Sequence, residues 1–186
     1  MFEDILQKDK ELLIFLNNLG SNHWDSFWLG ITNQLNWIPL FALIWFLTVR
    51  AFGWKKGGFA ILMMIVFVAF SDQLTNFVKD FFLRLRPNND LLINTQLRTL
   101  IRPQSHSFYS GHAATSTAFT FFVILLLKEK YRYIWFLFLF PLIFSYSRIY
   151  LGVHFPIDVI IGILVGVLFA TIYYKLFVVL NKKLFH

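Results

Sequence analysis

The chain has 186 residues, of which 58% are hydrophobic and only 15% are charged, and its mean hydropathy is +0.62. A soluble domain of this length would need much more polar surface, so the composition indicates a membrane protein. The absence of cysteine excludes disulfides and thiolate metal sites. The net charge of +7 lies in short groups between apolar stretches. We therefore expect no nucleic-acid partner and attribute the charge to membrane topology and anion binding.

The first 35 residues combine apolar and charged side chains. In residues 3–19, leucines and isoleucines are interspersed with lysines and acidic residues, a mixture typical of a helix lying in the membrane interface. Glu3 and Asp4 stand where a signal peptide would carry basic residues, so cleavage is not expected. Residues 22–35 contain two tryptophans, which favour the membrane–water boundary. Segment 1–35 is thus predicted to be an interfacial or partly inserted helix.

Five apolar stretches follow, at residues 36–50, 57–78, 111–127, 133–149 and 156–180. Crossing a bilayer takes roughly 20 apolar residues, so the shorter stretches would borrow flanking residues. The first could be extended by residues 24–35 as one helix broken around Pro39. No linker or repeat divides the chain. The sequence therefore predicts an all-α, integral-membrane bundle of five to six transmembrane helices, forming a single domain over residues 1–186.

Charge on the connections predicts the orientation of this bundle. Basic residues collect at 50–56, 128–132 and 175–183, which lie at the same ends of the predicted spans. Cytoplasmic connections carry an excess of lysine and arginine, so these segments are expected inside the cell. The opposite ends, including residues 79–102 and 148–154, are then expected to face outwards.

Three polar clusters occupy the outward ends of the spans: the first at 79–87, the second at 107–112 and the third at 147–158. Ser110 and Gly111 open a helix, where free N–H groups and the helix dipole favour an anion and glycine permits close approach. Lys79, Arg86 and Arg148 supply charge-assisted donors, which suit phosphate oxygens. The clusters together predict an anion site at one membrane edge.

The third cluster also contains candidates for chemistry. Ionisable residues at the membrane edge are costly and therefore suggest function. Pro156 is suited to the first position of a helix, which places His154 just before the helix and Asp158 in its first turn. The carboxylate can then accept the imidazole N–H and leave the other ring nitrogen free to react. With His112 as a second histidine, one ring can attack phosphorus while the other protonates the departing oxygen.

The ordered pattern Lys-x6-Arg-Pro, Ser-Gly-His and Ser-Arg-x5-His-x3-Asp resembles the type 2 phosphatidic acid phosphatase superfamily. That superfamily includes bacterial lipid phosphatases, glucose-6-phosphatase and vanadium haloperoxidases. The resemblance implies that His154 becomes a phosphohistidine, that Asp158 orients it, and that His112 is the general acid. It implies no metal and no cofactor. It further implies that the phosphate is held by Lys79, Arg86, Ser110, Gly111 and Arg148.

The function expected from this resemblance is metal-independent hydrolysis of an outer-leaflet lipid phosphate, in the bacterial inner membrane with the site facing the periplasm or exterior. The short chain looks like the small bacterial members that dephosphorylate undecaprenyl pyrophosphate. Phosphatidylglycerol phosphate, phosphatidic acid and lipid A phosphate are alternative substrates. Alternatives of another class are a vanadate-dependent haloperoxidase, which the apolar spans disfavour, and a non-catalytic lipid-binding protein, which retention of both histidines disfavours.

Three arginines in the outward-facing segments are not motif residues. Arginine at a helix end commonly extends its charged head to the interface while its stem packs on apolar surface. Arg84, Arg98 and Arg102 are therefore expected to be interfacial anchors rather than parts of the site.

Overall fold

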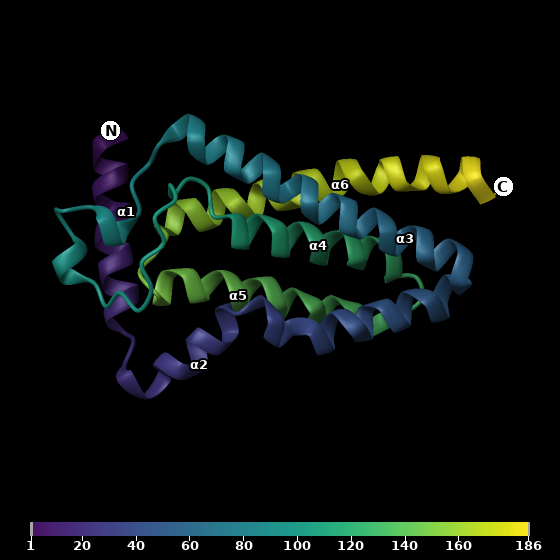
Figure 1. Cartoon of the computed structure of the whole chain (residues 1–186), viewed down its shortest axis with the longest axis horizontal. Coiled ribbons are helices and arrows are strands. Elements are labelled where there is room, and N and C mark those ends of the chain that lie inside the picture. The colour runs from purple at the N-terminus through teal and green to yellow at the C-terminus, as the bar shows by residue number, and fades with distance from the viewer. Residues whose placement is uncertain (1, 186) are drawn as a thin grey trace.

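The computed structural model describes residues 2–185, which form helices and connecting loops without a β-strand (Figure 1). The all-α prediction is therefore confirmed. Residues 34–89, 132–150 and 156–185 are helical stretches long and apolar enough to cross a membrane, and 111–127 is a shorter apolar helix. The elements in order are α1 (Phe2–Asn18), α2 (Asn22–Thr32), η1 (Gln34–Trp37), α3 (Ile38–Phe82), η2 (Pro87–Asn89), η3 (Asn94–Gln96), α4 (Gly111–Leu127), η4 (Arg132–Phe138), α5 (Leu139–Tyr150) and α6 (Pro156–Phe185).

Helix α3 folds back on itself at Gly53, which lies at φ +74° and ψ 173°. This left-handed φ suits glycine because it carries no Cβ. The two limbs, 38–52 and 54–82, run in opposite directions (Figure 1) and correspond to the predicted spans 36–50 and 57–78. They meet closely: a Cβ added at Gly57 would lie 3.0 Å from Val49 Cα. The predicted break at Pro39 falls at the start of α3, after the 3-10 turn η1.

Helix α4 lies at the centre of the bundle and is buried over most of its surface. Its apolar core residues include Phe122, Val123, Ile124 and Leu127, all fully buried. Helix α6 packs against it through small residues. A Cβ at Gly162 would lie only 2.7 Å from the carbonyl oxygen of Ser110, which caps α4, and a Cβ at Gly166 only 2.6 Å from that of Ala114. Such close backbone contact is typical of helix packing in membranes.

Large apolar side chains remain exposed on the outer faces of the bundle. Phe70 and Phe81 on α3, and Leu164, Leu168 and Ile172 on α6, are each more than half exposed. Contiguous apolar surface of this kind marks contact with a membrane or partner. Together with the apolar helices, it accords with an integral membrane protein.

Helix α1 lies across one end of the bundle rather than along it (Figure 1). It is anchored there by Leu13, which is fully buried, and by Asn17, whose Nδ2 donates to the Tyr150 carbonyl at 2.7 Å. The first residues of α4 and α6 lie at this same end. The bend of α3 and the C-terminal end lie at the opposite end, so the predicted cytoplasmic segments gather away from the polar clusters.

Candidate active site

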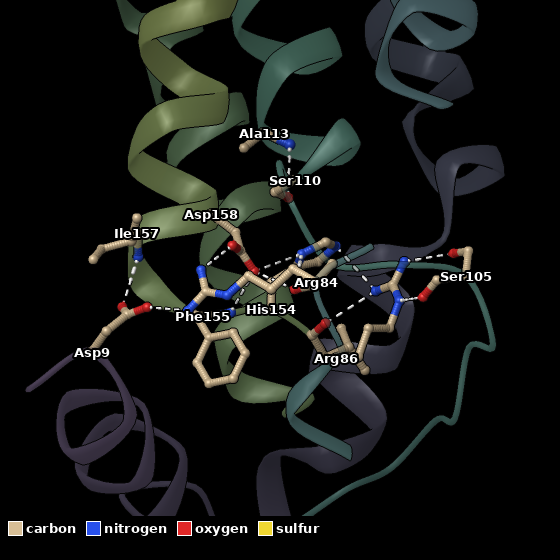
Figure 2. Close-up of polar contacts among 12 residues, drawn as sticks. Asp9, Arg84, Arg86, Ser105, Ser110, Ala113, His154, Phe155, Ile157 and Asp158 are labelled. Atoms are coloured by element: carbon tan, nitrogen blue, oxygen red, sulfur yellow. Dashed lines mark hydrogen bonds and ion pairs between the residues drawn. The ribbon is translucent and has the colours of Figure 1, made fainter. Parts of the chain in front are cut away.

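The three polar clusters converge where α3 and α5 end and where α4 and α6 begin (Figure 2). The loop 83–110 joins α3 to α4 and lies over this end, so the first two clusters meet the third. Residues separated by more than 60 positions along the chain thereby contact one another directly.

His154 is 1% exposed and lies in the turn between α5 and α6. Its Nδ1 is 3.5 Å from Asp158 Oδ2, and its Nε2 is 3.1 Å from Arg86 Nη1. A carboxylate can only accept, so the contact with Asp158 requires the proton on Nδ1. Burial lowers the pKa of His154 to about 3, although the bond to Asp158 acts in the opposite direction. The ring is therefore neutral at neutral pH, with the lone pair of Nε2 facing Arg86.

Asp158 is fully buried in the first turn of α6, as the position of Pro156 predicts. Its Oδ2 accepts hydrogen bonds from the Ser107 hydroxyl and from Phe155 N, the latter at 3.1 Å. Its Oδ1 accepts from Arg84 Nη1 at 2.5 Å. A carboxylate at a helix N-terminus is favoured by the helix dipole. These partners hold the carboxylate firmly beside the imidazole.

Arg86 is 4% exposed, and its guanidinium is held from two sides. Nε and Nη2 donate to the carbonyl and hydroxyl of Ser105 at 2.6 and 2.9 Å. Nη1 donates to the Val153 carbonyl at 3.0 Å and also faces His154. The cation is thus fixed next to the nitrogen that would attack phosphorus.

Ser110 and Gly111 begin α4, as predicted. The Ser110 hydroxyl accepts from Ala113 N at 3.4 Å, and its own N–H donates to the Asp158 carbonyl at 3.0 Å. A Cβ at Gly111 would lie 2.9 Å from Thr75 Cγ2 and 3.7 Å from Lys79 Nζ. The glycine is therefore required by close packing against α3. This packing also brings the ammonium group of Lys79 to the N-terminus of α4.

His112 and Arg148 face the same region from α4 and α5. The His112 ring stacks on Phe144, with centroids 5.1 Å apart and planes at 21°. Arg148 is 5% exposed; its Nη1 donates to Thr32 Oγ1 at 2.5 Å, whereas its buried Nε has no hydrogen-bond partner among the described residues. A buried donor without a partner is unusual in proteins. It suits a site that receives an anionic ligand.

The electrostatic balance of the site is positive. Arg148 interacts electrostatically with Lys79, Arg86 and both histidines. The nearest carboxylate, Asp158, is already paired with Arg84. One position is thus surrounded by the three cations Lys79, Arg86 and Arg148, by the start of α4 and by the two histidines. This arrangement binds a tetrahedral anion and offers a nucleophile with a second proton-transfer group, which are the requirements of phosphoryl transfer.

The prediction that Arg84 and Arg98 are interfacial anchors is wrong. Arg84 pairs with Asp158 and with Asp9 of α1, and Arg98 Nη2 binds Asp25 at 2.9 Å. Both cations are therefore used inside the protein, where they connect the N-terminal segment to the site end. Sequence reasoning missed these partners because Asp9 sits among charged neighbours that suggest a solvated face. Arg102 is exposed, as an anchor would be.

Comparison with known proteins places these residues in a family context. Residues 58–182 match the PAP2 superfamily model. The chain is 32% identical to a lipid A 4'-phosphatase of Bacteroides thetaiotaomicron over 87% of this chain and 73% of the relative. It is 28% identical to a lipid A 4'-phosphatase of Porphyromonas gingivalis, covering 94% and 75% of the two chains. An undecaprenyl-diphosphatase of Sulfolobus acidocaldarius is 32% identical over 81% of this chain and 62% of the relative.

Solved structures show the same fold. A transmembrane PAP2-type phosphatidylglycerolphosphate phosphatase from Bacillus subtilis superimposes with a TM-score of 0.72 at 20% identity, covering 97% of this chain and 88% of the other. Aquifex aeolicus LpxE superimposes with a TM-score of 0.61 at 28% identity, covering 89% and 93%.

Proposed function

Because the chain belongs to the PAP2 superfamily and is a membrane lipid phosphatase, we propose that it hydrolyses a phosphate monoester on the sugar head group of an outer-leaflet lipid. The 4'-phosphate of lipid A is the leading candidate. The support for this substrate is the 32% identity to a lipid A 4'-phosphatase over 87% of the chain. We do not propose the haloperoxidase and the non-catalytic lipid-binding alternatives, because these relatives are named as phosphatases.

The observation that carries the mechanism is the orientation of His154. Its Nδ1 faces Asp158 and its Nε2 faces Arg86, so the free lone pair points to the cationic side of the site. Bound phosphate would lie beside the Arg86 cation and take up the unpartnered Nε of Arg148, with Lys79 and the N–H groups at the start of α4 as further donors. These positive charges neutralise the negative charge of the phosphate oxygens, which would otherwise hinder the approach of the nucleophile.

The reaction then proceeds in two steps. His154 Nε2 forms a bond to phosphorus as the bond to the lipid oxygen breaks, and His112 gives that oxygen its proton. His112 next takes a proton from water, whose oxygen attacks phosphorus and releases the imidazole. Asp158 stabilises the positive charge that the ring carries while phosphorylated, in the manner of the carboxylate of a catalytic triad.

Undecaprenyl pyrophosphate is the second candidate substrate. The observation that favours it is the 32% identity to the Sulfolobus undecaprenyl-diphosphatase, although the chain spans only 62% of that protein. The two substrates differ in leaving group, since the monoester expels a sugar oxygen and the diphosphate expels a lipid phosphate. A lipid phosphate needs less help from a general acid, so the two reactions should depend differently on His112.

We further propose that the site end of the bundle faces outside the cytoplasm in a bacterial inner membrane. The support is the concentration of positive charge at the other end. A reporter fused after the last residue should then be active in the cytoplasm. Activity only outside the cytoplasm would reverse the orientation.

The test of substrate is phosphate release by the purified protein from lipid A, undecaprenyl pyrophosphate, phosphatidylglycerol phosphate and phosphatidic acid, side by side in the presence of EDTA. The largest kcat/KM should be on lipid A, and His154→Ala should be inactive on all four. The largest value on undecaprenyl pyrophosphate would favour the second candidate instead. Loss of all activity with EDTA and recovery with a divalent ion would contradict the metal-independent mechanism.

A further inference from the structure

Asp9 is the buried carboxylate of α1, a helix on which the other acidic residues, Glu3, Asp4 and Glu11, are exposed. It is 3% exposed, whereas Lys8 and Glu11 beside it are exposed. A carboxylate is costly to bury unless it is paired and hydrogen-bonded. Its position at the site end of the bundle therefore depends on specific partners.

Each oxygen of Asp9 accepts a hydrogen bond from a residue next to the site (Figure 2). Oδ2 accepts from Arg84 Nη2 at 2.8 Å, and Oδ1 accepts from Ile157 N at 2.9 Å. Ile157 is the second residue of α6, so its N–H has no acceptor within its own helix. Burial raises the pKa of Asp9, but the two accepted hydrogen bonds favour its ionised form.

Arg84 links Asp9 to Asp158. Its Nη1 donates to Asp158 Oδ1 at 2.5 Å while Nη2 binds Asp9, and the guanidinium lies 4.1 Å from the Phe155 ring centroid. One cation is thus shared between two carboxylates. Were Asp9 uncharged, the whole positive charge of Arg84 would act on Asp158 alone.

We propose that Asp9 is a positioning residue for phosphoryl transfer, which acts by sharing Arg84 and so leaving Asp158 with negative charge to stabilise the phosphorylated His154 ring. This inference rests on the proposed role of His154. The ring becomes cationic when Nε2 bonds to phosphorus with the proton still on Nδ1, and that charge develops 3.5 Å from Asp158. Asp9 therefore assists the transition state more than the bound substrate, an effect that appears in the rate of the chemical step.

Helix α1 does not depend on Asp9 alone for its position. Leu13 is fully buried, and Asn17 Nδ2 donates to the Tyr150 carbonyl at 2.7 Å while Asn17 Oδ1 accepts from Arg98 N at 2.7 Å. Removing only the charge of Asp9 should therefore leave the helix docked. The variant Asp9→Asn does this, because its amide oxygen can still accept from Ile157 N.

The experiment measures the pre-steady-state burst of p-nitrophenol that the protein in membranes releases from excess p-nitrophenyl phosphate, so that the identity of the lipid does not matter. Asp9→Asn should slow phosphoenzyme formation on the order of 10-fold, with the burst amplitude unchanged and KM within about 2-fold. Glu11→Gln is the matched control: it removes the same charge from the same helix at an exposed site, where the carboxylate accepts a hydrogen bond from Gln7 Nε2 at 2.9 Å. It should match the wild type.

A double-mutant cycle tests whether Asp9 acts through Arg84. In an Arg84→Gln background, Asp9→Asn should cause no further slowing, because the shared cation is gone. The proposal would be overturned if Asp9→Asn slowed the reaction equally in both backgrounds. It would also be overturned if Asp9→Asn had a normal rate of phosphoenzyme formation, whether or not its burst amplitude was reduced. If Asp9→Asn does not accumulate, Asp9→Ser is measured against the same predictions. An active His154→Ala variant would instead overturn the proposed mechanism, which separates the two failures.

Discussion

The contact between α4 and α6 sets the geometry of the site, and Gly166→Ala tests how tightly it is fixed. The new Cβ would lie 2.6 Å from the Ala114 carbonyl oxygen and 2.9 Å from Thr117 Cβ, where ordinary contacts begin at 3.4 Å. The neighbouring atoms are backbone and a branched side chain, so neither can rotate away. The two helices must separate by several tenths of an ångström.

The expected cost follows from overpacking and from helix propensity. Inserting a methyl group into a close-packed contact costs about 1–3 kcal/mol. Replacing glycine by alanine within a helix stabilises the folded state by about 0.5–1 kcal/mol, because alanine has the higher helix propensity. Gly58→Ala is the matched control, since nothing lies within 4 Å of its Cβ and only the favourable contribution remains. The two variants should therefore differ in free energy of unfolding by about 1–3 kcal/mol.

The assay is reversible unfolding of each purified variant in mixed micelles, followed by helical signal. Gly166→Ala should unfold earlier than the wild type and Gly58→Ala at the same point or later. Equal stability of the two variants would show that α4 and α6 are not in close contact at Gly166. Gly162→Ala, whose Cβ would lie 2.7 Å from the Ser110 carbonyl oxygen, should in addition reduce kcat because it displaces the start of α4 itself.

Three further predictions concern individual ionisable groups. His112→Ala should lose on the order of 10²–10⁴-fold in kcat on a lipid monophosphate and less on p-nitrophenyl phosphate, whose leaving group needs no proton; equal losses in steady-state assays would contradict its role as general acid. Because burial keeps the pKa of His154 at about 3, its ring resonances should not shift between pH 8 and 5 in an NMR titration of the five histidines, and a midpoint near 6.5 would contradict the neutral buried ring. The hydrogen bond from Tyr150 and the charge of Arg98 hold the pKa of Asp25 below its usual 3.8. The ionised Asp25 carboxylate therefore stabilises the folded protein above pH 3.8, and this stabilisation is lost as the pH falls through the lower pKa of the folded state. The difference in melting temperature between the wild type and Asp25→Asn should therefore vanish in acid.

Much of the bundle follows from local sequence. The predicted stretch 111–127 coincides with α4 because Ser110 supplies the cap and apolar residues continue to Leu127, where charged residues follow. Pro156 begins α6 as expected, which fixes His154 before the helix and Asp158 within its first turn. These features are predictable because caps, proline and apolar length act over a few residues.

The contacts that complete the site were not predictable in the same way. Asp9 meets Arg84 across 75 positions and Thr32 meets Arg148 across 116. Such pairs depend on how the N-terminal helices fold over the end of the bundle, and no local pattern encodes that. The charged residues around Asp9 resemble a solvated helix face, and Arg84 resembles an interfacial arginine, until the tertiary structure brings them together.

The proposed mechanism requires that His154 forms the bond to phosphorus. The most direct measurement is rapid quench of the enzyme with ³²P-labelled lipid phosphate, followed by mapping of the acid-labile label. The label should appear on His154, rise before free phosphate, and be absent from His154→Ala. Label on His112, or normal turnover by His154→Ala, would contradict the account.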